Sequence, residues 1–171
     1  MLPWIERKWK FDLPVELYPD ILERLRGTPA RAAEAVRDLN KDVLTRREKE
    51  GSWSIQENVG HLGDAEELWK GRLDDFQAGA ATLRPADMTN AKTHQAGHNE
   101  KLIGEVLQRF RAARGRLMDR LDGLEAEHFA RSSLHPRLNT PMRLLDLCVF
   151  VADHDDYHLA RIRRLLRLFQ H

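Results

Sequence analysis

The sequence has a single cysteine, Cys148, among its 171 residues. One cysteine cannot build an internal disulfide framework and fits a reducing compartment, so we expect a cytoplasmic protein. An excess of charge of one sign is also missing: 28 lysine and arginine residues oppose 27 aspartate and glutamate residues, which leaves a formal net charge of +1. Because no global field draws the chain to a polyanion or an anionic bilayer, we expect neither nucleic acid nor membrane as a partner.

Long apolar runs, internal repeats and low-complexity tracts are absent as well. Residues 1–14 carry a charge every few positions, which is typical of neither a secretory signal nor a membrane span. They hold Trp4, Trp9 and Phe11 between charges and two prolines, and we expect them to form an extended arm packed over a core. A chain of this length can bury one core without disulfides, so residues 15–171 are predicted to form a single domain.

Apolar residues recur at steps of three and four positions, whereas the alternation typical of strands is missing. Hydroxyl residues followed by proline predict helix starts at Thr28–Pro29 and Thr140–Pro141, and Ser54 with Glu57 matches a capping box. Gly27 predicts a helix end, because glycine accepts the left-handed cap conformation. Together these signals predict helices over residues 15–26, 28–39, 55–78, 103–124 and 140–169. The expected fold class is all-α, a four-helix bundle with a short extra helix near the N-terminus.

The last predicted helix carries two histidines on its apolar stripe. Val151, His154, His158 and Ile162 follow one another at steps of three and four, so the two imidazoles lie on the inward face, one turn apart. Side chains four positions apart on a helix have Cβ atoms about 5–6 Å apart, and both rings can bind one ion at roughly 2.0–2.1 Å from nitrogen. The spacing alone is equally compatible with two histidines that merely complete the core.

His61 favours the metal hypothesis over the core hypothesis. It lies in the middle of the helix predicted over residues 55–78, where it can face the same bundle interior as His154 and His158. Three buried neutral imidazoles need partners, and one divalent ion supplies a partner for all three. Three histidine ligands leave a coordination position for water or substrate, as in catalytic sites, and imidazole suits zinc, nickel, iron and copper alike.

Three aspartates, Asp153, Asp155 and Asp156, surround the histidine pair on the last helix. A carboxylate next to a ligating ring can orient that ring or accept a proton during catalysis. We take Asp155 as the candidate catalytic residue, while a solvated acid is the alternative interpretation for each of the three. Cys148 falls on the apolar side of the same helix and is expected to be a small buried residue rather than a nucleophile.

Two segments resemble the DinB/YfiT-like superfamily of metalloenzymes, which are four-helix bundles. The first is the W-S-x-x-E-x-x-x-H-L segment from Trp53 to Leu62, and the second is the H-x-x-x-H segment from His154 to His158. The resemblance implies that His61, His154 and His158 bind a divalent metal, with zinc or nickel as the expected ions. It also implies a homodimer. Relatives include transferases that use a low-molecular-weight thiol such as bacillithiol or mycothiol, a thiol-dependent isomerase, and proteins described as hydrolases.

Three functions are therefore open, and all are compatible with the same three histidines. The first is a metal-dependent thiol S-transferase, in which the ion activates the thiol of a small cofactor toward a small-molecule substrate. The second is a metal-dependent hydrolase that uses metal-bound hydroxide, with Asp155 or Glu57 as a proton shuttle. The third is a non-catalytic metal-binding helical protein. A hydrolase turns over with metal alone, so thiol dependence separates the first two functions.

Overall fold

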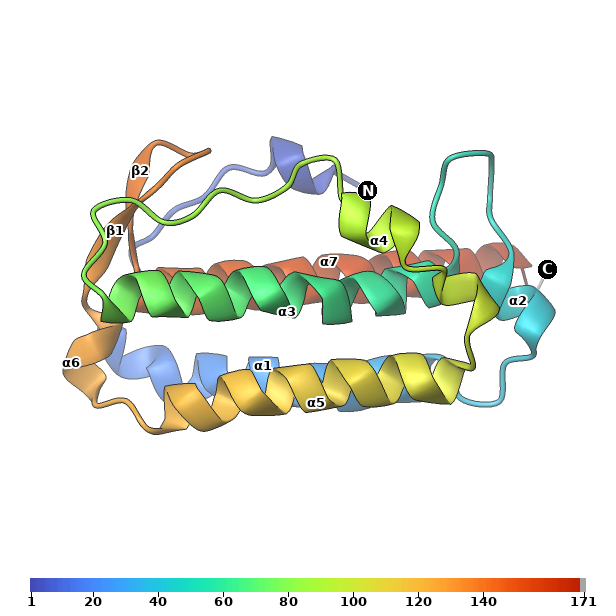
Figure 1. Cartoon of the computed structure of the whole chain (residues 1–171), viewed down its shortest axis with the longest axis horizontal. Helices are drawn as coiled ribbons and strands as arrows, with labels where there is room; N and C mark the ends of the chain where they lie inside the picture. Colours follow the sequence, from blue (N-terminus) through green and yellow to red (C-terminus); the bar gives the residue numbers. More distant parts are fainter. Residues whose placement is uncertain (170–171) are drawn as a thin grey trace.

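The computed structural model describes residues 1–169, in which four long helices form a bundle (Figure 1). The helices α3 and α7 form one layer, and α1 and α5 form the other. Helix α3 contacts α5 and α7, and α1 contacts the same two helices. The all-α four-helix bundle expected from the sequence is confirmed. The long helices are α1 (Tyr18–Ala35), α3 (Ile55–Gln77), α5 (Ile103–Asp122) and α7 (Leu144–Phe169).

Short elements connect the four helices. The two strands pair in an antiparallel hairpin, with Ser132 opposite Arg143 and His135 opposite Thr140. No helix within residues 1–169 combines the length and the apolar character that crossing a lipid bilayer needs. The short elements are η1 (Trp4–Glu6), η2 (Val15–Leu17), α2 (Lys41–Thr45), α4 (Ala91–Gln95), η3 (His98–Glu100), α6 (Ala126–Phe129), β1 (Ser132–His135) and β2 (Thr140–Arg143).

Helix α1 is continuous through Gly27, Thr28 and Pro29, so the predicted helix end at Gly27 and new start at Pro29 are wrong. Proline has no backbone N–H and therefore leaves the carbonyl four residues earlier without its helical partner. Here that carbonyl belongs to Leu25, and it accepts a hydrogen bond of 2.9 Å from Nη1 of Arg114 on α5. A side chain from a neighbouring helix thus replaces the bond that Pro29 cannot make.

Thr140 and Pro141 do not start a helix but lie in strand β2, and the expectation that no strand occurs is wrong for the described chain. Pro141 is tolerated there because the backbone N–H and carbonyl of Leu134, its partner in β1, point away from Pro141. The Leu134 N–H donates to the Ala81 carbonyl, and the Leu134 carbonyl accepts from the Leu83 N–H, both at 2.9 Å. The buried residues of β1 are Ser133 and His135. Both are polar, so the sequence of this strand shows no apolar alternation.

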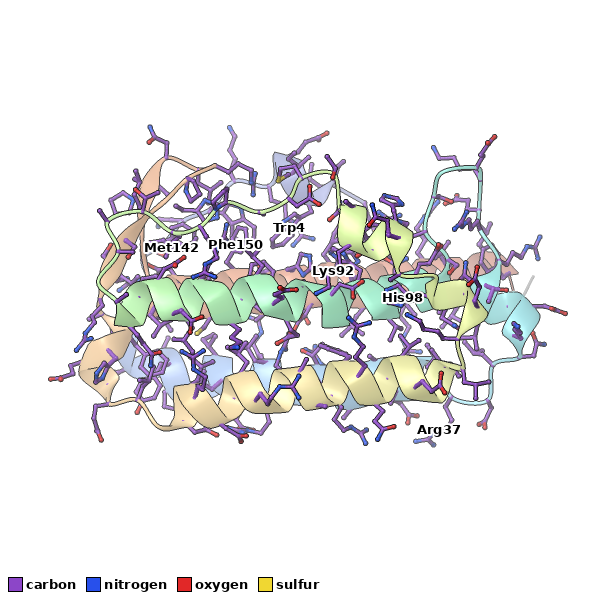
Figure 2. The ribbon with its side chains drawn as sticks, in the orientation of Figure 1. Trp4, Arg37, Lys92, His98, Met142 and Phe150 are labelled. Atoms are coloured by element: carbon purple, nitrogen blue, oxygen red, sulfur yellow. The ribbon has the colours of Figure 1, made fainter. Side chains whose placement is uncertain are left out.

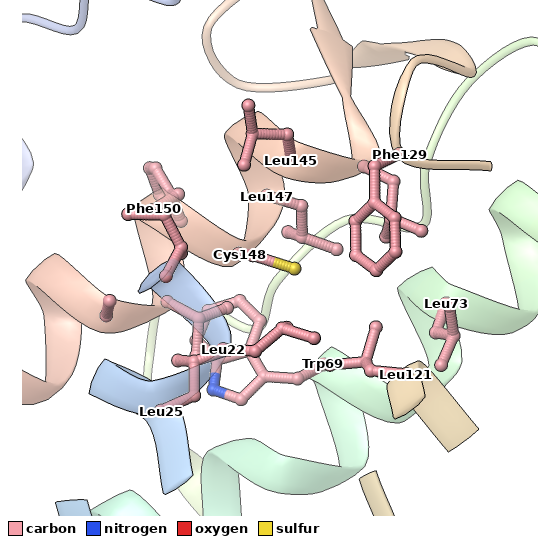
Figure 3. Close-up of a cluster of buried hydrophobic side chains, with 14 of the residues drawn as sticks. Leu22, Leu25, Trp69, Leu73, Leu121, Phe129, Leu145, Leu147, Cys148 and Phe150 are labelled. Atoms are coloured by element: carbon pink, nitrogen blue, oxygen red, sulfur yellow. The ribbon is translucent and has the colours of Figure 1, made fainter. Parts of the chain in front are cut away.

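The main apolar core lies between α1, α3, α5 and the first half of α7 (Figure 3). Cys148 lies inside it among Leu22, Leu145 and Phe129, and burial raises the pKa of its thiol to about 12. This agrees with the expected role as a small buried residue. Residues 1–14 run along the outer side of the α3–α7 layer (Figure 1), where Trp4 and Trp9 pack against this core.

Candidate metal centre

The two layered helices α3 and α7 bring three histidines together. His61 comes from α3, His154 and His158 come from α7, and each has one ring nitrogen within 4.8 Å of the others. The exposed fractions are 8%, 6% and 4%, respectively, so all three imidazoles are buried. The Nε2 atoms of His61 and His154 are 3.2 Å apart. We call this group the histidine triad.

Hydrogen bonds to Nδ1 fix the tautomers of two of these rings. The Asn58 amide donates to the Ser54 carbonyl at 2.7 Å, so its Oδ1 faces Nδ1 of His158 at 2.9 Å. An oxygen acceptor requires the proton to be on Nδ1, and Nε2 of His158 is left with a free lone pair. Within residues 1–169, Nδ1 of His154 has no hydrogen-bond partner, so its tautomer is not fixed in this way.

A chain of three side chains fixes His61 in the same manner. The Thr93 hydroxyl donates to Oδ2 of Asp64 at 3.1 Å, and it lies 3.0 Å from Nδ1 of His61. Since its single proton is directed at the carboxylate, the hydroxyl oxygen accepts the Nδ1 proton of His61. Nε2 of His98 lies 2.7 Å from the same carboxylate oxygen. His98 therefore supports the triad through three successive hydrogen bonds.

All three imidazoles are held in the neutral form. Burial lowers the pKa of His61 and of His154 to about 3, and it lowers the pKa of His158 well below its usual range. The neighbouring imidazoles lower the pKa of His61 and His158 further. Neutral imidazole is the form that ligates metals, so no proton has to be removed before an ion binds.

The donor set fits a divalent ion. A tetrahedral ion that holds two imidazole nitrogens at about 2.0–2.1 Å keeps them about 3.3 Å apart. The separation of 3.2 Å between Nε2 of His61 and Nε2 of His154 matches that value. Two further features are typical of metal ligands: the lone pairs on Nε2 of His61 and His158, and the oxygen acceptors opposite their Nδ1 atoms.

Aromatic side chains surround the triad. The Trp53 ring lies 4.6 Å from the His61 ring and 5.9 Å from the His158 ring, measured between centroids. On the other side, the Trp4 ring lies 5.2 Å from the His154 ring. Figure 2 shows Trp4, which belongs to the N-terminal arm, near Phe150 on the outer side of the α3–α7 layer. The arm therefore forms part of the wall of the site.

Asp155 lies next to His154 in sequence but is engaged elsewhere. It is fully buried. Its Oδ2 accepts hydrogen bonds of 2.7 Å from the Thr28 hydroxyl and from Nη1 of Arg114. Its Oδ1 accepts a hydrogen bond of 3.1 Å from Nη2 of Arg114. A catalytic role for Asp155 stays a prediction. Its contacts favour a structural role, because both oxygens already have donors. Asp153 and Asp156 form ion pairs with Arg24.

Sequence reasoning did not find Asn58, Thr93 or Asp64. Asn58 precedes His61 by one helical turn, so its place inside the Trp53–Leu62 segment was an available signal. Thr93 had no such signal, since it lies 32 positions from His61 and reaches it only because α4 folds over α3. His98 is buried and bonded to Asp64, whereas the His94 ring packs 5.7 Å from Trp53.

The sequence model of the DinB superfamily matches residues 24–162, which include the whole histidine triad. This chain belongs to the DinB superfamily. The resemblance noted in the sequence is thereby confirmed. No curated protein matches the chain.

Two solved structures have a similar fold. One is YfiT from Bacillus subtilis, described as a probable metal-dependent hydrolase with an unusual four-helix bundle topology. The match has a TM-score of 0.81 and 23% sequence identity, and it covers 96% of this chain and 94% of YfiT. The other is a mycothiol-dependent maleylpyruvate isomerase, with a TM-score of 0.66 and 11% identity. That match covers 87% of this chain and 60% of the isomerase. At these identities the likeness shows the shared fold.

Proposed function

We propose that this DinB superfamily protein is a metal-dependent enzyme that acts on a small molecule, with His61, His154 and His158 as ligands of zinc or nickel. The observation that carries the proposal is the triad itself: three buried neutral imidazoles, two of them with Nδ1 fixed by an oxygen acceptor. When bound by three imidazoles, a divalent ion keeps a coordination position open and lowers the pKa of a water or thiol held there. A homodimeric state and a cytoplasmic location stay predictions.

The nucleophile has to come from outside the chain. The Cys148 thiol is buried in the core with a pKa of about 12, so it is not ionised near neutral pH. The carboxylates nearest to the triad also have partners. Asp64 is bonded to Thr93 and His98, and Glu57 accepts from the Ser54 N–H and from Arg47. Free water and a small thiol are the two remaining nucleophiles.

We favour the thiol, which makes the protein a metal-dependent thiol S-transferase. A thiol becomes a nucleophile by losing one proton, and a bound divalent ion favours that loss without a protein base. Hydrolysis benefits from a carboxylate that is free to take the proton of water. Glu57 and Asp155 accept hydrogen bonds on both oxygens, and Asp64 is engaged through Oδ2, while its Oδ1 has no hydrogen bond within residues 1–169. The mycothiol dependence of the structurally similar isomerase supports this choice. Bacillithiol and mycothiol are the cofactor candidates.

Hydrolysis is the second candidate, and the similarity to YfiT supports it, because that match covers nearly all of both chains. The two functions differ in what turnover requires. Purified protein loaded with zinc or nickel is assayed with bacillithiol or mycothiol and the electrophile 1-chloro-2,4-dinitrobenzene, and separately with 4-nitrophenyl acetate without thiol.

We expect the thiol conjugate to form only when metal, thiol and protein are all present. The His61→Ala variant should lose this activity, and His128→Ala, which removes a half-buried histidine of α6 outside the triad, should retain it. Ester cleavage by the metal-loaded protein without thiol, lost in His61→Ala, would instead establish the hydrolase. Activity that survives in His61→Ala contradicts both.

The hydrogen bond between Thr93 and His61 predicts a graded effect on metal affinity. Thr93→Val keeps the shape of the side chain but removes the oxygen that accepts the Nδ1 proton of His61. We expect zinc affinity to fall by roughly 10–100-fold, the range found when such partners of metal ligands are removed. Competition with a chromophoric chelator measures it. Thr89→Val, in the turn just before α4, is the control, since the Thr89 hydroxyl contacts Asp87. Equal affinities in the two variants would contradict the role of Thr93.

A further inference from the structure

Two arginines lie fully inside the molecule, and only one of them has a counter-ion. Arg114 is 1% exposed and bonds to the carboxylates of Glu66 and Asp155 at 2.6–3.1 Å. Arg72 on α3 is 2% exposed, and its Nε donates to the Arg84 carbonyl at 3.2 Å. No carboxylate in residues 1–169 forms an ion pair with Arg72. The nearby Asp75 is bound by the Arg84 side chain at 2.7 Å.

An unpaired buried cation is costly, so the surroundings of Arg72 call for an explanation. Burial, together with the charge of Arg137, lowers the pKa of Arg72 to about 10, which still leaves it charged at neutral pH. The same two arginines, after burial, lower the pKa of His135 to about 4, so this imidazole next to them is neutral. Asp75 attracts the charge of Arg72 from a distance, but its own ion pair is with Arg84, so Arg72 has no carboxylate of the described chain in direct contact.

His135 presents a hydrogen-bond donor without an acceptor. The ring is 1% exposed, and its Nδ1 accepts the Leu138 N–H at 3.2 Å. The proton of the neutral ring is therefore on Nε2, and this buried atom has no partner among the described residues. The indole N–H of Trp9, also buried, has none either. Both rings pack on Phe150, with centroid distances of 5.4 Å for His135 and 4.7 Å for Trp9.

These groups share one chemical property: each offers an N–H that no acceptor in the described chain answers. They are Nε2 of His135, Nε1 of Trp9, and the Nη atoms of Arg72, whose Nε alone has a partner within residues 1–169. Buried polar groups in proteins have partners in the large majority of cases, and several unanswered donors beside a positive charge that has no ion-pair partner match the oxygens of an anion. We propose that Arg72 and His135, with the Trp9 indole, bind a carboxylate of the small-molecule substrate. That the carboxylate belongs to a substrate rests on the proposed function, whereas the anion site itself does not.

The position of this anion site relative to the histidine triad indicates the rest of the ligand. Arg72 follows His61 by eleven positions on α3, which places it on the same helix face about 16 Å further along the axis. Trp69 lies between them: its ring is 5.5 Å from the His154 ring and 5.7 Å from the Arg72 guanidinium carbon. With Trp4 and Phe150 it forms an aromatic lining. The ligand class is therefore a carboxylate joined through an apolar or aromatic body to the reactive group.

The N-terminal arm covers the site and supplies Trp4 and Trp9. Side chains hold its backbone at two points, where Nη2 of Arg143 donates to the Leu13 carbonyl at 2.9 Å and Nη1 of Arg137 donates to the Ile5 carbonyl at 3.5 Å. A ligand that displaces or reseats the arm changes the surroundings of both indoles. Tryptophan signals are therefore a direct report of occupancy.

The test measures binding of benzoate, of its neutral analogue benzamide and of inorganic phosphate to the metal-loaded protein, by calorimetry and by the indole N–H resonances. We expect benzoate to bind, benzamide to bind at least tenfold more weakly, and the Trp9 resonance, assigned with Trp9→Phe, to shift with benzoate. Arg72→Met should lose at least tenfold in benzoate affinity. Arg26→Met, which removes an exposed arginine paired with Asp122, should bind as the parent does. Tighter binding of phosphate than of benzoate would overturn the carboxylate assignment.

Two controls separate this proposal from the metal proposal. His61→Ala should lose metal and still bind benzoate, whereas Arg72→Met should keep its metal. Benzoate binding that disappears in His61→Ala and survives in Arg72→Met would mean that the carboxylate binds the metal, and the anion site would be wrong. In anion-free buffer, Arg72→Met should melt no lower than the parent, and benzoate should raise the melting temperature of the parent alone. A variant that melts far below the parent would overturn the proposal, since Arg72 would then be a structural residue.

Discussion

His61→Ala is expected to reduce bound zinc or nickel from about one ion per chain to a trace. The substitution removes one of three converging imidazoles, and the loss in affinity should exceed the roughly 10–100-fold that removal of a ligand's hydrogen-bond partner costs. Elemental analysis of the purified, untagged protein measures it. The thermal midpoint gives a second readout, because an ion present at 1,000 times its Kd stabilises the folded state by about 4 kcal/mol.

The matched control for this experiment is His128→Ala, which removes one imidazole from α6 and leaves the triad complete. It should keep the metal content and the metal-dependent rise in melting temperature. Equal metal content in His61→Ala and the parent would refute the site. If neither protein bound zinc or nickel, the triad would be a set of core histidines held by Asn58 and Thr93 alone.

Arg114→Met is expected to destabilise the fold by about 3–5 kcal/mol, the cost of breaking a buried ion pair from one side. The guanidinium is 1% exposed and binds Glu66 and Asp155, which are 4% and 0% exposed. Without it, two buried carboxylates lose their counter-ion. The Leu25 carbonyl, left without a helical partner by Pro29, also loses its donor. Urea denaturation followed by circular dichroism gives the change in free energy of unfolding.

A second variant tests whether uncompensated charge is the cause of the lost stability. Combining Arg114→Met with Glu66→Gln and Asp155→Asn removes the uncompensated charges and should recover part of the lost stability. Burial already raises the pKa of Glu66 to about 7, so its carboxyl is readily neutralised. A loss below about 1 kcal/mol in Arg114→Met would show that the network is not needed for stability. The comparison with Arg72→Met, where no loss is expected, separates a paired arginine from an unpaired one.

The sequence by itself determined the helices that depend on local signals. The capping box at Ser54 is present, with the Ser54 hydroxyl accepting from the Glu57 N–H at 3.0 Å and Glu57 accepting from the Ser54 N–H at 2.8 Å. The one-turn spacing of His154 and His158, read against the apolar stripe, placed both rings inward. Such inferences succeed because neighbours along a helix fix one another's positions within a few residues.

The tertiary structure decided everything that depends on a partner far away in the sequence. Pro29 lies inside a helix because Arg114, on another helix, binds the carbonyl that the proline leaves free. Thr140 and Pro141 lie in a strand, and the strand accommodates the proline because the backbone of Leu134 forms its hydrogen bonds with Ala81 and Leu83, on the side away from Pro141.

The same reason governs the functional residues. Thr93 supports His61 only after α4 folds over α3, and the difference between Arg72 and Arg114 is invisible in the sequence, since both are arginines on long helices. One forms ion pairs with two buried carboxylates, and the other has a backbone carbonyl but no carboxylate of residues 1–169 in direct contact. The effect of burying a charge depends on what lies opposite it, and that is set by how the helices pack rather than by the chain on either side.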